Sequence, residues 1–520
     1  MMSQSMPRAM EARMDLELPQ LDLKGLAAAL PKFGAKGAAV RAKADAAVVN
    51  LLARTTFGYT EDELALASGA GFDAWLEYQL DHEAIDDGGL EEILTEFFPT
   101  LAMDYNGLFR AGRGDSDGPT AAFELIYATV LRQAFSPRQL YEVMVEFWTN
   151  HFNVFLFDGP VQYFKTVDDR DHIRPHALGT FGDLLHANAS SPAMLSYLDN
   201  YSNTAEGPNE NYARELLELH TLGVDGGYTE FDVKETARCF TGWTLTTRVP
   251  GLFYFDPLSH DFGGKSVLGT DIAPNRGIED GRQVLNLLAD HPSTATYIAG
   301  KLARRFISDQ PPAAAVTAVA ETFRETGGDI RSMLRTLFRT EAFAASAGQK
   351  FKRPAEFVTS MLRRINPEAG GDFLGVLVRQ LQVMGQLPYF ETQPTGYDDV
   401  EGSWLSTSSL LGRWNLASAV GFGTPPAFAA DGRGRVPPMA QFLPVDIAAM
   451  VGGADQPAAI VDALVERVLH HPVSSEEWVA LVKLAAGGRK PGMRLSPREV
   501  DAAARSVLAA IMGSRHFLRR

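Results

Sequence analysis

The chain has 520 residues, 45% of them hydrophobic, so it can bury a large core and form two or three structural lobes. Its formal net charge of −16 argues against nucleic acid or an anionic membrane as the main partner, because both require clustered positive charge. The single cysteine, Cys239, excludes an internal disulfide and any metal cage built from several thiolates.

Residues 1–44 mix Met, Lys, Ala and Gly without a sustained period, which predicts a flexible N-terminal arm. This arm lacks the apolar run of a signal peptide, and no later stretch reaches the roughly 18 apolar residues of a membrane span. The sequence therefore predicts no membrane span and a cytoplasmic location.

Residues 45–520 are predicted to form one mainly α-helical unit, because apolar residues recur at helical spacing along most of this length. We divide it into an N-terminal helical lobe at 45–135, a central motif region at 136–290 and a C-terminal helical lobe at 291–520. Helices are expected at 46–57, after Thr60, at 72–80, after Ser136, after Thr229 with Asp232 completing a capping box, at 294–307 after the N-cap Ser293, and at 312–326, 330–340 and 354–365. An irregular loop of unusual length is expected at 386–404. Alternating Thr and aromatic residues predict a small β-hairpin or extended element around 244–270.

The densest polar chemistry lies at 209–227, where Asn209 is a good helix N-cap. Glu210, Arg214 and Glu218 recur every four residues, which predicts a row of ion pairs, and Asn211 and Glu215 form a second row beside it. The loop before this helix is rich in short oxygen-bearing side chains of the kind that hold a hard cation or a polar ligand, although its spacing is not that of an EF-hand: Asp199, Asn200, Asn203 and Glu206.

His220 stands near the end of the same predicted helix. At about 100° per residue it lies about 140° from Glu215, so the two side chains do not easily share one ion. We therefore expect a hydrogen-bonded histidine at the helix end in place of a metal ligand.

Two further histidines are candidates for chemistry. His151 follows an aromatic cluster, which fits a packed core histidine and equally a base whose pKa is tuned by a hydrophobic wall. His260 and Asp261 precede flexible glycines, so they could approach a ligand closely. The sequence that follows, Gly264-Lys265-Ser266, is not a phosphate-binding P-loop, because position 259 is Ser where that motif needs Gly.

Several blocks taken together resemble the large bacterial family called domain of unknown function 1800. They are Phe147-Trp148-Thr149-Asn150-His151-Phe152, Pro192-Ala193-Met194-Leu195, Asp199-Asn200, Asn209-Glu210-Asn211-Tyr212-Ala213-Arg214-Glu215-Leu216, Thr241-Gly242-Trp243, His260-Asp261 and Gly264-Lys265. The resemblance runs from about Val48 to the C-terminus. It implies no assigned activity, but it implies export in many members, hence a periplasmic alternative, and a neighbouring family with sulfatase-like features as a protein partner.

Two hypotheses for function follow. The first is an enzyme or ligand-binding protein with a polar site and an unknown ligand, to which a divalent cation could be bound. The second is a non-catalytic scaffold for another protein, in which the same residues form a structural network. The candidate catalytic residues are His151, Glu215, His260 and Asp261, and the candidate ligand-binding residues are Asn150, Glu210, Asn211 and Arg214.

Overall fold

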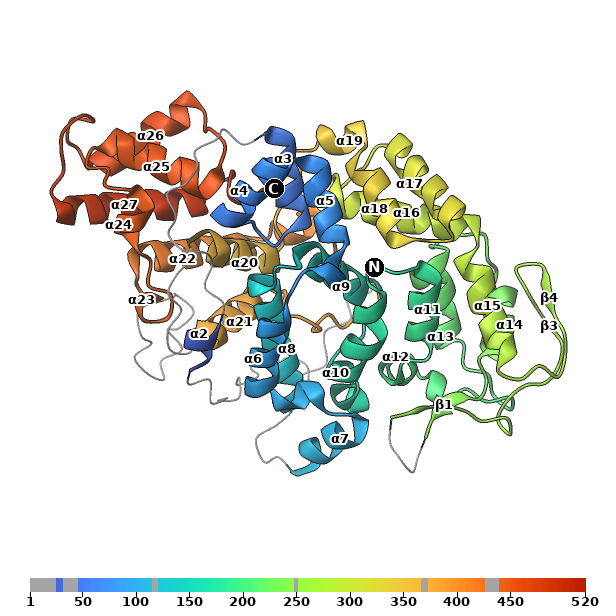
Figure 1. The fold of residues 1–520 in the computed structure, drawn as a ribbon. Helices are drawn as coiled ribbons and strands as arrows, with labels where there is room; N and C mark the ends of the chain where they lie inside the picture. The colour runs from blue at the N-terminus through green and yellow to red at the C-terminus, as the bar shows by residue number, and fades with distance from the viewer. Residues whose placement is uncertain (1–24, 31–44, 115–119, 247–250, 366–372, 426–438) are drawn as a thin grey trace.

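The computed structural model describes residues 25–30, 45–114, 120–246, 251–365, 373–425 and 439–520. Helices dominate these ranges, which confirms the predicted mainly α-helical fold (Figure 1). Most of the predicted flexible arm, 1–24 and 31–44, lies outside the described residues, while the short helix α2 (Leu26–Ala29) is described and Leu26 is buried. No helix in the described ranges is long and apolar enough to cross a lipid bilayer.

The helices follow one another in chain order. The N-terminal helices are α3 (Ala46–Thr55), α4 (Glu61–Ala70), α5 (Phe72–Leu80), α6 (Gly88–Phe97), α7 (Tyr105–Gly114) and α8 (Thr120–Phe135). The central helices are α9 (Gln139–His151), α10 (Lys165–Val167), α11 (Phe181–Ala189), α12 (Pro192–Tyr197), α13 (Asn211–Glu215), α14 (Glu230–Cys239) and α15 (Glu279–Ala289). The remaining helices are α16 (Pro292–Phe306), α17 (Ala313–Thr326), α18 (Ile330–Phe338), α19 (Glu341–Ala344), α20 (Pro354–Ile365), α21 (Phe373–Val383), α22 (Thr407–Phe422), α23 (Met439–Phe442), α24 (Ile447–Val451), α25 (Pro457–Leu469), α26 (Ser475–Ala486) and α27 (Pro497–Met512).

Two small antiparallel hairpins follow α14 and confirm the predicted β element. Strand β1 (Trp243–Leu245) pairs with β2 (Phe253–Phe255), and β3 (Lys265–Val267) pairs with β4 (Thr270–Ile272). Lys265 therefore begins a strand, and the glycines before it do not lead into a helix as they would in a P-loop.

Local capping explains several helix starts. Thr60 and Glu63 form a reciprocal capping box at α4, and Thr229 with Asp232 forms the one predicted at α14. The predicted N-cap Ser293 is wrong. Pro292 occupies the first turn of α16, and the ring nitrogen Nδ1 of His291 accepts the hydrogen bond from the Ser293 N–H at 3.1 Å.

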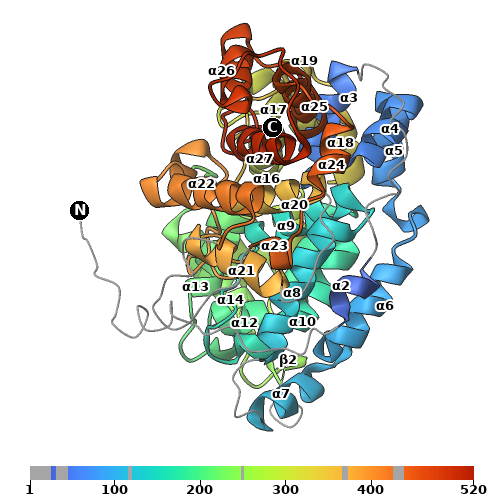
Figure 2. The ribbon, with the colours of Figure 1, turned by 90° about the vertical axis from the view of Figure 1, so that its left-hand side faces the viewer.

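The buried apolar residues form two large clusters. One joins α3–α5 to the helices from α9 to α19, and the other joins α2, α6 and α8 to α20–α27. Helix α8 is buried along almost its whole length, from Ala121 to Ala134, and stands in the middle of the molecule in both views (Figures 1 and 2). The predicted lobe boundaries stay predictions.

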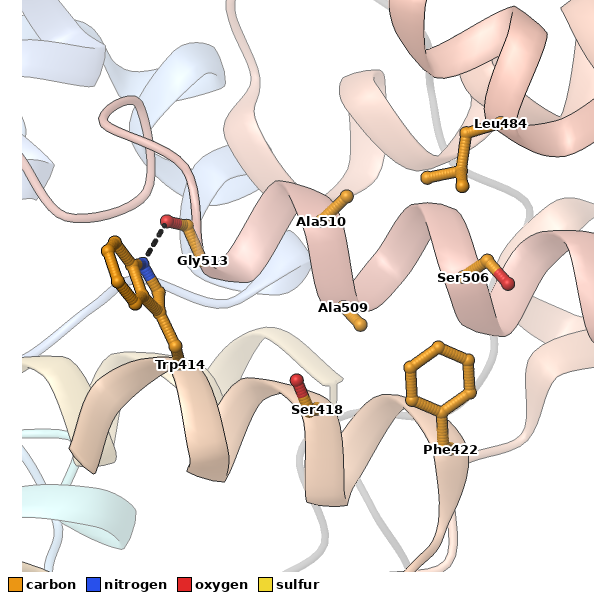
Figure 3. A pocket seen from close by; sticks show the side chains of 8 residues that line it. All are labelled: Trp414, Ser418, Phe422, Leu484, Ser506, Ala509, Ala510 and Gly513. Atoms are coloured by element: carbon orange, nitrogen blue, oxygen red, sulfur yellow. Dashed lines mark hydrogen bonds between the residues drawn. The ribbon is translucent and has the colours of Figure 1, made fainter. Parts of the chain in front are cut away.

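A groove of about 370 Å³ lies on the C-terminal part of the molecule, between α22 and α27 (Figure 3). Trp414 and Phe422 of α22 are each 49% exposed along it, and the Trp414 indole N–H donates to the Gly513 carbonyl at 3.0 Å. Leu484 reaches the groove from α26. None of the side chains that line this groove is titratable, so it offers apolar contact and no acid or base.

Candidate functional site

The segment predicted to be one helix from Asn209 onward is divided in two. The predicted N-cap Asn209 is wrong: Glu210 is the N-cap of α13, and the Asn209 side-chain oxygen accepts from the Asn211 N–H at 3.0 Å in the turn before it. Helix α13 then passes into a π-helical turn, η7 (Leu216–Thr221), in which the Leu222 N–H reaches the Leu217 carbonyl five residues back. A π turn changes the angular spacing of side chains, so the 100° rule does not hold beyond α13.

The predicted ion-pair row is correct at one end and wrong at the other. Arg214 pairs with Glu210 at 3.2 Å, but its closest carboxylate is Glu230 at 2.6 Å. Glu218 accepts instead from the Tyr228 hydroxyl at 3.2 Å, because the π turn moves it off the row. Arg214 remains 35% exposed, which makes this group a surface ion-pair cluster.

Glu215 is half-buried at the end of α13, and its side chain makes no hydrogen bond or ion pair with the described residues. Burial, with Glu218 adding to it, raises the pKa of the Glu215 carboxyl. Asn211 beside it is exposed.

His151 ends helix α9 and is only 1% exposed. Its Nε2 lies 3.0 Å from the His220 carbonyl oxygen, and its Nδ1 lies 2.8 Å from the Lys301 Nζ of α16. A carbonyl only accepts, so Nε2 carries the proton, and Nδ1 is left to accept a hydrogen bond from Lys301. Phe147, Phe152 and Trp148 surround the ring.

Burial and the nearby cations favour the neutral forms of His151 and Lys301. Burial, then Lys301, then His220 hold the pKa of His151 well below its usual range. Burial and then Arg304, opposed by Asp399, lower the pKa of Lys301 to about 8. Lys301 is partly exposed as a whole residue, while protein atoms crowd its terminal nitrogen.

The predicted hydrogen bond of the His220 side chain is absent among the described residues. His220 is fully buried, but neither ring nitrogen has a hydrogen-bond partner among the described residues, in contrast to the predicted hydrogen-bonded histidine. Burial and then Lys301 lower the pKa of His220 to about 3. The histidine contributes its backbone carbonyl to His151, and the π turn places that carbonyl at the end of α9.

His260 belongs to a different cluster. Its Nδ1 lies 2.7 Å from the Thr241 carbonyl oxygen, and its Nε2 lies 3.3 Å from Asp280 Oδ2. The same Asp280 oxygen accepts from Lys265 Nζ at 2.7 Å, and both side chains of this ion pair are fully buried. Lys265 also donates to the Gly263 carbonyl at 2.9 Å and to the Asp261 carbonyl. All three ammonium protons of Lys265 thus have acceptors.

The side chain of Asp261 points elsewhere. Its Oδ2 accepts from Arg238 Nε at 2.7 Å and its Oδ1 from the Gly263 N–H at 2.8 Å. The Arg238 hydrogen bond, ahead of the other causes, lowers the pKa of the Asp261 carboxyl. Asp261 therefore shapes the turn around Lys265.

Asn150 holds the long irregular loop at 386–404. Its side-chain amide donates to the Tyr397 carbonyl at 2.8 Å, and its side-chain oxygen accepts from the Tyr397 N–H at 2.7 Å. Asn153 donates to the carbonyls of Glu391 and Gln393 at 2.9 and 2.7 Å. Gly396 meets the same helix end so closely that an added Cβ would lie 2.2 Å from the Asn150 carbonyl oxygen. This loop carries Asp399 toward Lys301.

The candidate residues thus fall into separate groups with separate partners. His151 joins Lys301, while His260 joins Asp280 and Lys265. Lys301 and Asp280 each lie on an amphipathic helix of ordinary composition, so a charged residue on the apolar face was the one sequence signal that could have found them. In the described ranges, no group of three or more His, Cys, Asp or Glu side chains could hold a metal ion, so the divalent cation stays a prediction.

The chain was compared with known proteins at three levels. A family described as "Protein of unknown function (DUF1800)" matches residues 50–519. No curated protein and no solved structure matches the chain. The match covers most of both apolar clusters and every residue of the two histidine groups.

Proposed function

The chain belongs to the DUF1800 family of proteins of unknown function, and we propose that it is an enzyme or ligand-binding protein centred on His151 and Lys301. In this proposal the group around His260 is structural. The observation that carries the proposal is the hydrogen bond from Lys301 to His151, which joins a lysine to a neutral base with no carboxylate between them.

Among the described residues, most buried lysines have a carboxylate partner. Lys165 pairs with Asp168 at 2.5 Å, Lys265 with Asp280 at 2.7 Å and Lys350 with Asp309 at 2.7 Å. No ion pair to Lys301 occurs in the described part of the chain, and the nearby Asp399 lies within 4.0 Å of Lys350, Arg353 and Arg305. An unbalanced lysine in a crowded site lowers stability, and such a residue supports a role in chemistry.

The rival proposal is the non-catalytic scaffold. The Lys265 group and the loop held by Asn150 support it, because both use polar side chains to fix the chain path. Under this proposal Lys301 is one more structural contact, and its removal weakens the fold.

Two matched variants separate these proposals. Lys265→Met leaves Asp280 buried without its cation, so it is expected to lose about 3–5 kcal/mol of unfolding free energy at pH 7. Lys301→Met removes an unbalanced charge and is expected to stay within about 1 kcal/mol of the parent or to gain stability. Urea unfolding measures both. A loss in Lys301→Met equal to that in Lys265→Met would favour the scaffold.

A further inference from the structure

We propose that Lys301 is a nucleophile that forms an imine with a carbonyl compound carrying a carboxylate, of the 2-oxo acid class, and that His151 moves the proton. This inference rests on the proposed function and assigns its substrate class. The residues that carry it lie on three separate parts of the chain: the end of α9, the π turn η7 and helix α16.

The geometry leaves Lys301 Nζ available for reaction. One of its hydrogens points to His151 Nδ1 at 2.8 Å, and this is the only hydrogen bond that Nζ makes to a described residue. By contrast, the three acceptors around Lys265 occupy every hydrogen of that ammonium group. Lys352 is the other buried lysine without a carboxylate, but it packs on the Phe517 ring at 3.9 Å and is only 9% exposed. Lys301 combines a missing countercharge with partial exposure of the residue as a whole.

The groups facing Lys301 come from three elements of the chain. On α16 itself lie Arg304, whose charge disfavours the ammonium form, and Tyr297, whose ring centroid is 5.6 Å from Nζ. From α9 comes His151, held neutral by burial, and from the 386–404 loop comes Asp399, the one group that favours the ammonium form. A lysine pKa of about 8 leaves roughly a tenth of the amine unprotonated at pH 7, against about 0.03% for an ordinary lysine.

The reaction uses only these groups and the ligand. The free amine of Lys301 attacks the carbonyl carbon, a C–N bond forms, and the C=O π electrons move to oxygen. One nitrogen proton passes to His151 Nδ1 and from there to the oxygen, which gives the carbinolamine. The second nitrogen proton follows the same route as the C–O bond breaks, so the oxygen leaves as water. The products are the imine and one molecule of water, with no oxidant or reductant needed. The His220 carbonyl keeps Nε2 protonated, so Nδ1 is the nitrogen that receives the proton.

Arg304 supplies the preference for a carboxylate. It lies three residues after Lys301 on α16, so both side chains project from one face of the helix. Arg304 is exposed and forms no ion pair with any described residue, unlike the next residue Arg305, which pairs with Glu356. A free guanidinium one turn from the reactive amine suits an anionic ligand group.

The test is reductive trapping on the full-length protein. Glyoxylate with cyanoborohydride, followed by site-resolved mass spectrometry, is expected to modify Lys301 on the order of tenfold faster at pH 7 than the exposed Lys234, Lys483 and Lys490. Equal rates at all four positions would overturn the inference. This measurement uses the parent protein, so it does not depend on the folding of any variant.

Two variants test the roles of Lys301 and Arg304 in this reaction. Lys301→Arg should abolish trapping at this position while keeping the charge. Arg304→Gln raises the pKa of Lys301 and so slows both probes through the smaller fraction of free amine, but it should slow glyoxylate trapping several-fold more than trapping of the uncharged propionaldehyde. An equal effect on both probes would overturn the carboxylate preference.

Competitive acetylation separates this inference from the proposed function. Trace acetic anhydride reacts with any accessible free amine, so its pH profile reports the titration of Lys301 without a carbonyl ligand. A midpoint near pH 8 without glyoxylate trapping would overturn the imine and keep the proposed function. A midpoint near that of the exposed lysines would overturn both.

Discussion

The two histidine–lysine groups of this protein are built from the same residue types but differ in charge balance. Around His260, Lys265 has Asp280 as counterion and two backbone carbonyls as further acceptors. Around His151, Lys301 has only an imidazole nitrogen. The first arrangement satisfies every donor of its lysine, whereas the second leaves a cation without a matching anion.

The difference shows how to separate structural from reactive polar groups when sequence patterns look alike. Substitution of either partner in a buried ion pair with all donors satisfied is destabilising, because the remaining partner is left charged and buried without a counterion. A buried lysine without a counterion loses its charge easily, and an uncharged amine is a base and a nucleophile. Four changes test this comparison.

The largest expected effect is in the balanced group. Asp280→Asn leaves the Lys265 ammonium buried without a counterion and should lower the unfolding free energy by about 3–5 kcal/mol at pH 7. Urea unfolding measures the loss. In the double variant Asp280→Asn with Lys265→Met, part of that stability should return, because no charge is then stranded. A double variant as unstable as the sum of the single ones would contradict the pairing.

The next effect concerns His220, which is buried beside the unbalanced pair. Its pKa is lowered to about 3, so between pH 6.5 and 3 the unfolded chain binds more protons than the folded one. Stability should therefore fall as pH falls through this window, by about 2 kcal/mol at pH 5 from this residue. His220→Phe should remove that dependence and gain about 1 kcal/mol at pH 7, because two unpartnered nitrogens disappear.

Thermal and urea unfolding at pH 5 and 7 measure this prediction. Tyr212 has an unpartnered hydroxyl in the same buried region and no titration near these pH values, so Tyr212→Phe is the control. An unchanged pH slope in His220→Phe would show that other groups cause the acid sensitivity.

A smaller effect is expected at Glu215, a candidate catalytic residue. Glu215→Gln should change the unfolding free energy by less than about 1 kcal/mol, because the carboxylate has no partner among the described residues to lose. Because the pKa of the folded Glu215 carboxyl is raised, this residue lowers stability at pH values at which it is charged. Any gain in unfolding free energy from Glu215→Gln should therefore appear above that pKa. A loss of about 1.5–3 kcal/mol would indicate charge-assisted hydrogen bonds and a structural role. Glu218→Gln, which makes the same substitution about one helical turn away, is the control variant.

The smallest effect is expected at the surface. Arg214→Ala breaks ion pairs to Glu210 and Glu230 that are 35% exposed or more, so it should cost under about 1 kcal/mol. Addition of salt should shrink the difference from the parent further. A much larger loss, independent of salt, would place the guanidinium in a buried role.

Features that depend on neighbouring residues could be predicted. The helix at 72–80 and the one at 313–326 follow from apolar spacing and from glycine or proline at their ends, and Thr60 and Thr229 cap their helices through residues three positions away. The strands near 244–270 and the irregular 386–404 loop were also predicted. In each case the physical cause acts within about one turn of the chain.

The site could be predicted only in part, and the reason is distance along the chain. His151 was found because it interrupts an aromatic run, but its partner Lys301 lies 150 residues later. Glu218 was assigned to the wrong partner because the π turn after Glu215 is not encoded by any spacing rule. The partner of Asn150 is a backbone segment almost 250 residues away.

The sequence by itself determined the helical class, the family and the residue types that carry polar chemistry, because composition, periodicity and capping are local properties of the chain. Tertiary structure alone decided which lysine received a carboxylate and which did not. Charge balance in a low-dielectric interior depends on groups that folding brings within a few ångströms, and helices α9, α16 and η7 meet only once the core has packed. The packing of these helices leaves Lys301 without a carboxylate partner, whereas Lys265 has Asp280.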